Sequence, residues 1–148
     1  MLAWLNRNFP QGGGYDGYKV IFSPLVAYNQ SATWFDTPGY RELQAHVNFP
    51  YPRDLARSRA ETLSPAAALL FRGNIVFTEL NHGFINPEAD RYGARAAAAV
   101  ADHDFWVDAA KGKGYYSGLA AFNEYMNWAL VSLRLVDLGP QDELAGMI

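Results

Sequence analysis

Two acidic side chains and one imidazole stand out in this sequence because each lies in a stretch that is otherwise mostly apolar. Glu79 and His82 are three positions apart within residues 74–84, and Glu124 is the only charged residue between positions 117 and 133. If residues 74–84 form a helix, Thr78, Glu79 and His82 share one face, because residues three or four apart are neighbours there. A carboxylate and an imidazole on one face can transfer protons or bind a metal ion.

Glu124 is expected to have a partner. A carboxylate that is buried alone either destabilises the fold or takes up a proton. His82 or a cation is the natural partner. In the alternative interpretation, Glu124 faces solvent and His82 is a hydrogen-bonded core residue, and the sequence leaves both open.

The other two histidines are weaker candidates for the same site. His46 lies on a predicted strand next to polar residues. His103 lies between Asp102 and Asp104, a pattern that is typical of a hydrated helix surface.

The N-terminal part of the chain predicts a loop followed by a small sheet. Residues 1–17 contain Pro10 and a glycine-rich run at 12–17, which disfavours a helix and lacks the spacing of a phosphate-binding loop. Residues 18–22 are β-branched and aromatic, and residues 43–49 alternate between apolar and polar types, so both predict strands. We expect the two strands to form an antiparallel sheet.

The rest of the chain predicts helices. Residues 53–61 permit one, and Ser64 followed by Pro65 is typical of a helix start, with a break near Gly73. Residues 74–84 continue as a helix that Asn86-Pro87 is expected to end. Residues 87–110 are alanine-rich and predicted helical, residues 111–114 are an exposed break, and residues 117–135 give the strongest helix prediction.

Composition limits the class of protein. A chain of 148 residues, half of them hydrophobic, is expected to form one domain over residues 1–148. The net charge is -3 and the basic residues are scattered, which argues against a nucleic-acid partner. No apolar run approaches the roughly 20 residues of a membrane span, and no signal-peptide core is present. Without cysteine, any metal must be held by nitrogen and oxygen ligands.

Two segments resemble a known family. Residues 78–87, T-E-L-N-H-G-F-I-N-P, are similar to the H-E-F-x-H-x-F-x-N-P active-site helix of an uncharacterised bacterial family of gluzincin-type zinc metallopeptidases. Residues 122–126, F-N-E-Y-M, resemble the downstream glutamate helix of that family. The resemblance is specific over roughly residues 72–135, and upstream only residues 23–26 suggest a matching strand.

The resemblance implies that Glu79 is the general base, His82 the second zinc ligand and Glu124 the third. Such a site would lower the pKa of a zinc-bound water to about 7 for attack on a peptide carbonyl. Further site candidates within the two motifs are Asn81, Asn86 and Tyr125.

The first histidine of the motif is replaced by Thr78, whose hydroxyl is a poor zinc ligand because it stays protonated. Three outcomes are open: Glu79 becomes a ligand, His46 replaces the missing imidazole, or no metal binds.

The sequence therefore predicts an α+β, zincin-like domain with a small N-terminal sheet packed on three or four helices. The expected function is a zinc-dependent, metallopeptidase-like hydrolase acting on peptides or proteins, or a degenerate relative. The competing interpretation is a non-enzymatic module that binds a peptide or a glycan in an aromatic cleft. Relatives of this kind are often exported, whereas this chain shows no export signal.

Overall fold

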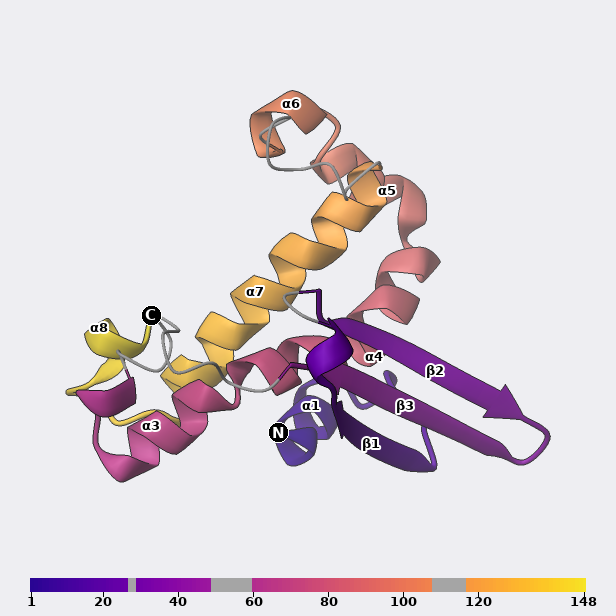
Figure 1. Cartoon of the computed structure of the whole chain (residues 1–148). Coiled ribbons are helices and arrows are strands. Elements are labelled where there is room, and N and C mark those ends of the chain that lie inside the picture. The colour runs from indigo at the N-terminus through magenta and orange to yellow at the C-terminus, as the bar shows by residue number, and fades with distance from the viewer. Residues whose placement is uncertain (27–28, 49–59, 108–116) are drawn as a thin grey trace.

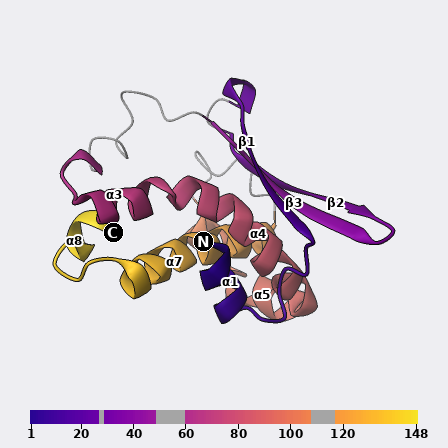
Figure 2. The same cartoon turned by 90° about the horizontal axis from the view of Figure 1, so that it is seen from below.

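The computed structural model describes residues 1–26, 29–48, 60–107 and 117–148, and this part of the chain has an α+β architecture (Figure 1). A small three-stranded sheet lies against helix α4, and helix α7 packs on α4, so that α4 contacts both partners (Figure 2). The elements are, in chain order, α1 (Leu2–Asn8), β1 (Gly17–Phe22), the 3-10 turn η1 (Pro24–Val26), β2 (Ser31–Thr37), β3 (Tyr40–Val47), α3 (Pro65–Arg72), α4 (Asn74–Arg91), α5 (Gly93–Ala99), α6 (His103–Trp106), α7 (Gly118–Leu138) and α8 (Leu144–Met147).

The sheet is mixed, which corrects the expected antiparallel pairing. Its order is β1-β3-β2, with β1 parallel to β3 and β2 antiparallel to β3. The two predicted strands at 18–22 and 43–49 correspond to β1 and β3, and residue 49 lies outside the described residues. Strand β2 was missed because it is an edge strand with both faces largely exposed, so burial imposes no apolar alternation on it.

The prediction of a loop over residues 1–17 is wrong for its first half, where α1 forms. Trp4 and Leu5 of this helix are buried, and the Trp4 ring packs edge-on against Phe77 with centroids 5.6 Å apart. The Trp4 indole N–H donates to the Asp137 carboxylate at 2.8 Å. This packing stabilises a seven-residue helix that is too short to be stable alone.

The prediction that Asn86-Pro87 ends the central helix is also wrong, because α4 continues through Pro87 to Arg91. Proline has no N–H, so the carbonyl of Gly83, four residues earlier, loses its usual donor. The Tyr15 hydroxyl donates to this carbonyl at 3.3 Å and replaces the missing bond. A residue from the glycine-rich N-terminal segment thus lets the helix tolerate its proline.

Two helix starts are confirmed. Ser64 accepts from the Ala67 N–H at 3.4 Å, and Ser117 accepts from the Ala120 N–H at 3.2 Å. The break at Gly73 is also present.

Other helix predictions differ from the structure or lie outside the described residues. Where one helical segment was predicted over 87–110, the structure has the end of α4 followed by the short helices α5 and α6. The described part holds seven α-helices rather than three or four, several of them only one or two turns long. Residues 53–59, 108–110 and 111–114 are not among the described residues.

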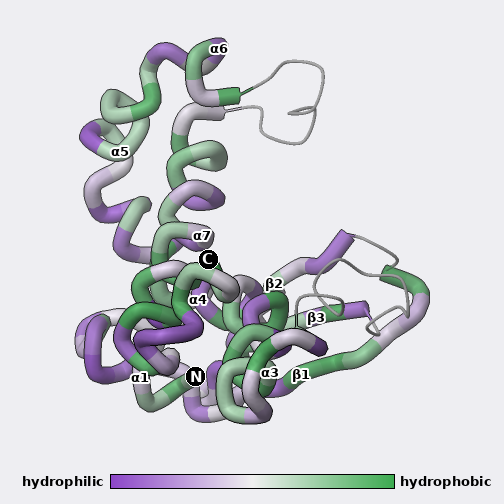
Figure 3. The backbone as a smooth tube through the Cα atoms, turned by 90° about the vertical axis from the view of Figure 1, so that its left-hand side faces the viewer, coloured by the Kyte–Doolittle hydropathy of each residue, from purple (hydrophilic) through white to green (hydrophobic). Residues whose placement is uncertain are grey.

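The interior is formed where α4, α7 and β3 meet. Phe77 and Phe84 of α4 and Leu43 of β3 are fully buried there. Hydrophobic and polar residues alternate along α4 and α7 (Figure 3). The polar residues Asn81 of α4 and Asn127 of α7 are fully buried. Within the described residues, none of the helices combines the length and apolar character needed to cross a bilayer.

Gly83 allows α4 to lie close to the sheet. A Cβ atom at this position would lie 2.5 Å from Cδ2 of Leu43, which is closer than van der Waals contact permits. The glycine of the T-E-L-N-H-G-F motif thus has a packing role.

Candidate functional site

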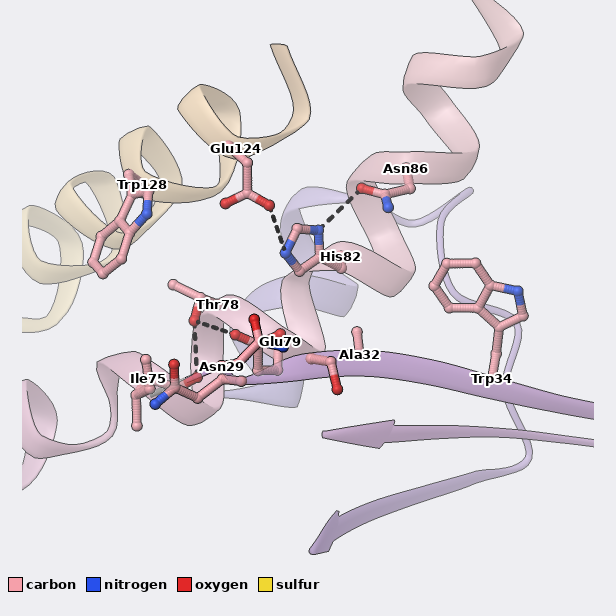
Figure 4. Close-up of a pocket in the computed structure, with 12 residues that line it drawn as sticks. Asn29, Ala32, Trp34, Ile75, Thr78, Glu79, His82, Asn86, Glu124 and Trp128 are labelled. Atoms are coloured by element: carbon pink, nitrogen blue, oxygen red, sulfur yellow. Dashed lines mark hydrogen bonds and ion pairs between the residues drawn. The ribbon is translucent and has the colours of Figure 1, made fainter. Parts of the chain in front are cut away.

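A pocket of about 400 Å³ opens between α4, α7 and the start of β2 (Figure 4). It is lined by Asn29, Gln30, Ser31, Ala32, Trp34, Ile75, Thr78, Glu79, His82, Asn86, Glu124 and Trp128. The three residues singled out from the sequence, Glu79, His82 and Glu124, are all among them.

His82 and Glu124 meet in this pocket although 42 positions separate them in the sequence (124 − 82 = 42). The His82 Nε2 atom lies 3.5 Å from the Glu124 Oε1 atom, and the two side chains are 14% and 31% exposed. α4 and α7 run antiparallel here, since Arg134 donates to Asn74 at 3.0 Å at the other end of the interface. The prediction that Glu124 has a partner, and that His82 is in contact with it, is confirmed.

Neighbouring amides fix the orientation of the His82 ring. Nδ1 lies 3.2 Å from Oδ1 of Asn86, an oxygen that only accepts, so this contact favours the tautomer with the proton on Nδ1. Nε2 is the nitrogen that faces Glu124. Asn86 lies one turn after His82 on α4, and in the tautomer that it favours Nε2 keeps its lone pair.

Asn127, which the sequence reasoning missed, completes this environment. It is fully buried, and its amide nitrogen lies 2.9 Å from Nε2 and 2.7 Å from Nδ1 of His82. It donates to whichever of the two ring nitrogens carries the lone pair in the neutral ring. Its Oδ1 atom is buried with no partner among the described residues, so rotation of the amide would offer an acceptor to a protonated ring. An available signal was its polar side chain in an apolar helix, one turn after Glu124.

Glu79 is the most buried carboxyl of the pocket, with 7% of its surface exposed. Burial raises the pKa of Glu79, and the nearby Glu124 carboxylate acts in the same direction, whereas His82 and the Thr78 hydroxyl oppose the shift. A carboxyl group with a raised pKa exchanges its proton closer to neutral pH than an ordinary glutamate does. Glu79 is therefore suited to general acid and base chemistry.

The hydroxyl of Thr78 points back into its own helix. It donates to the Ile75 carbonyl at 2.8 Å, and its oxygen lies 3.3 Å from Glu79 Oε1. A hydroxyl has one proton, so Thr78 can donate to only one of these two oxygens at a time, and donation to Glu79 favours the ionised carboxylate. This arrangement does not present Thr78 as a metal ligand.

The side chains of the pocket supply some of the ligands that a metal ion needs. Nε2 of His82 and the Glu124 carboxylate are close enough to share one ion, and Glu79 lies within electrostatic reach of both. Within the described ranges, no group of three or more histidine, aspartate or glutamate side chains is already arranged as a metal site.

Three of the remaining candidates lie outside the pocket. Nε2 of His46 lies 2.9 Å from the Thr33 hydroxyl on the sheet face opposite Leu43, so the structure does not bring His46 to the pocket. Asn81 is fully buried between α4 and α7, where its amide lies 3.5 Å from the Asn127 carbonyl. The hydroxyl of Tyr125 donates to the Trp106 carbonyl away from the pocket. His103 begins α6.

Two tryptophans of the pocket were not singled out from the sequence. Trp34 is 51% exposed and Trp128 is 54% exposed, although most aromatic residues were expected to fill the core. Trp128 lies four positions after Glu124 on α7, which places both on one helical face. That spacing was the available signal, whereas Trp34 follows from the missed strand β2.

In comparisons with known proteins, no family model matches the chain, and no curated protein or solved structure matches it.

Proposed function

We propose that the pocket is the site of a metallopeptidase-like hydrolase on a zincin-like, gluzincin-type fold, weakened by the replacement of one ligand histidine. The observation that carries this proposal is the meeting of His82 and Glu124 at 3.5 Å in a pocket that also contains Glu79. These three residues occupy the base and ligand positions that the T-E-L-N-H and F-N-E-Y-M motifs imply. Their convergence supports the resemblance, because the two motifs are distant from each other in the sequence.

A metal ion would be held by His82 through Nε2 and by Glu124. When bound, it would polarise a carbonyl group and lower the pKa of water beside it. Through its contact with Nδ1, Asn86 favours the tautomer that carries the lone pair on Nε2. Glu79, whose pKa is raised by burial, would accept a proton from the attacking water and return it to the leaving amine of the peptide. With Thr78 turned into its helix, two protein ligands remain where catalytic zinc sites use three, and Glu79, which also lines the pocket, is the candidate for the third.

A peptide is the substrate class that best fits the strand beside the pocket. In the sheet formed by the described residues, β2 is an edge strand, and residues 31, 32 and 34 of it line the pocket. The free edge of a strand carries backbone N–H and C=O groups that can pair with an extended peptide.

The experiment that tests the proposal combines metal analysis with hydrolysis. Protein purified without chelator or added metal is analysed for bound elements, and hydrolysis of a fluorescently quenched casein is measured with and without Zn²⁺. We expect weak, zinc-dependent hydrolysis that Glu79→Gln abolishes. Glu88→Gln, on the exposed side of the same helix, is the matched control and should retain activity. Loss of activity and metal together in Glu79→Gln would identify Glu79 as a ligand rather than a base.

A non-enzymatic binding module is the second candidate, and the two exposed tryptophans of the pocket favour it. A folded protein with no bound metal and no zinc-dependent hydrolysis, but with measurable ligand affinity, would support this candidate over the hydrolase.

A further inference from the structure

Trp34 and Trp128 lie on opposite sides of the acid and imidazole cluster. Trp128 follows Glu124 on α7 and, in the antiparallel interface, lies level with the Ile75 end of the pocket (Figure 4). Trp34 pairs with Leu43 on the sheet, and Leu43 packs on Gly83, so Trp34 lies at the Asn86 end. The side chains of Glu79, His82 and Glu124 lie between the two rings.

Exposed tryptophans at such positions are poorly explained by packing alone. About half of the surface of Trp34 and of Trp128 is exposed to solvent, whereas the core tryptophan Trp4 is 5% exposed. A large aromatic side chain placed at a pocket wall provides apolar contact area to a ligand that covers it.

The charge of the pocket restricts the ligand further. Of its twelve lining residues, Glu79 and Glu124 are acidic and none is lysine or arginine. Among the described residues, the lining therefore offers no lysine or arginine to pair with a carboxylate of a ligand, and acidic side chains would be repelled by the ionised glutamates. The remaining polar groups are amides and hydroxyls, including Asn29 and Gln30, which hydrogen-bond uncharged groups.

We propose that the pocket binds an extended, non-acidic peptide segment with a large apolar or aromatic side chain on each side of the cluster. One such side chain packs on Trp34 and the other on Trp128, while the backbone between them runs past Glu79, His82 and Glu124 beside the edge of β2. The peptide nature of the ligand rests on the proposed function. The two ring-binding subsites rest on the positions and exposure of the tryptophans.

The proposal is tested by binding of synthetic peptides to the full chain carrying Glu79→Gln, which prevents turnover. The probes are acetylated and amidated fluorescent peptides with two phenylalanines separated by one to four alanines. Matched peptides have one or both phenylalanines replaced by alanine or by glutamate. Dissociation constants are measured by fluorescence anisotropy, with chelator present in one series and Zn²⁺ in the other.

We expect one spacing to bind best and each Phe→Ala replacement to weaken binding about five- to tenfold. Trp34→Ala should remove the benefit of one phenylalanine and Trp128→Ala that of the other, whereas Trp34→Phe and Trp128→Phe should retain most of it. Trp106→Ala is the control, because Trp106 is an exposed tryptophan of α6 that does not line the pocket. Thermal unfolding of each variant shows whether the fold is retained.

Equal binding of the phenylalanine and alanine peptides would overturn the proposal, as would equal effects of the pocket variants and Trp106→Ala. Displacement of the peptides by neutral cellotetraose at lower concentration than by unlabelled peptide would overturn it in favour of a glycan ligand. Ring-dependent peptide binding without metal or hydrolysis would support the two subsites and refute the hydrolase. Hydrolysis that does not depend on the two tryptophans would support the hydrolase and refute the two subsites.

Discussion

Replacing Glu79 by glutamine is expected to stabilise the folded protein at neutral pH. The carboxyl group is 7% exposed and its pKa is raised by burial, so ionising it costs more in the folded chain than in the unfolded chain. Glutamine keeps the size of the side chain and an oxygen that can stay beside the Thr78 hydroxyl, 3.3 Å away. The change removes the charge without creating a cavity.

The magnitude follows from linkage between protonation and folding. Each unit by which the folded pKa exceeds the unfolded one corresponds to about 1.4 kcal/mol of lost stability above the folded pKa. We expect Glu79→Gln to raise the free energy of unfolding by on the order of 1 kcal/mol at pH 7, as is common when a functional carboxylate is neutralised. Because the pKa of Glu79 is higher in the folded chain than in the unfolded chain, ionisation of Glu79 opposes folding as the pH rises toward and through the folded pKa. The stability gained by Glu79→Gln should therefore disappear below the unfolded pKa of about 4.3.

Urea unfolding followed by circular dichroism at pH 7 and at pH 4, with chelator present, measures this difference. Glu88→Gln on the same helix is the control, since Glu88 forms an exposed pair with Arg91 at 2.9 Å and should change stability by less than about 0.5 kcal/mol. A loss of more than about 1 kcal/mol in Glu79→Gln at pH 7 would mean that the ionised carboxylate is a structural partner and would refute the reasoning. An equal increase in the free energy of unfolding at both pH values would show that the stabilisation by Glu79→Gln is not electrostatic.

Three further predictions concern the pocket and the contact between α4 and the sheet. Glu124→Gln should change the free energy of unfolding at pH 7 by less than about 1 kcal/mol or raise it, because this carboxylate is partly exposed, and a larger loss in urea unfolding would contradict this. Thr78→His should bind Zn²⁺ at least about tenfold more tightly, or ~1.4 kcal/mol, in calorimetric titration at neutral pH, and equal affinities would count against the proposed ligand geometry. Gly83→Ala should destabilise the protein by about 1–3 kcal/mol because its Cβ would meet Leu43. Gly93→Ala, whose Cβ would have nothing within 4 Å, should be neutral or stabilising, and thermal unfolding of both glycine variants measures the difference.

The sequence by itself determined the features that depend on near neighbours in the chain. Ser64 and Ser117 mark helix starts because a capping hydroxyl bonds to a backbone N–H only three residues away. Glu79 and Glu124 stood out because a charge in an apolar helix needs an explanation wherever that helix lies. The expectation that Glu124 meets a partner follows from the cost of removing a carboxylate from water. His82 was the expected partner because an imidazole can donate a hydrogen bond to a carboxylate.

Only the tertiary structure decided the features that depend on segments distant in the chain. The sequence cannot indicate that Tyr15 supplies a donor to the Gly83 carbonyl, so the helix was expected to stop at Pro87. Strand direction has no local signature either, because parallel and antiparallel neighbours use the same residue types. The positions of Trp34 and Trp128 at the pocket walls depend on how the edge strand and α7 lie against α4. Local bonding therefore set the helix starts and the candidate residues, whereas long-range packing set the sheet and the shape of the pocket.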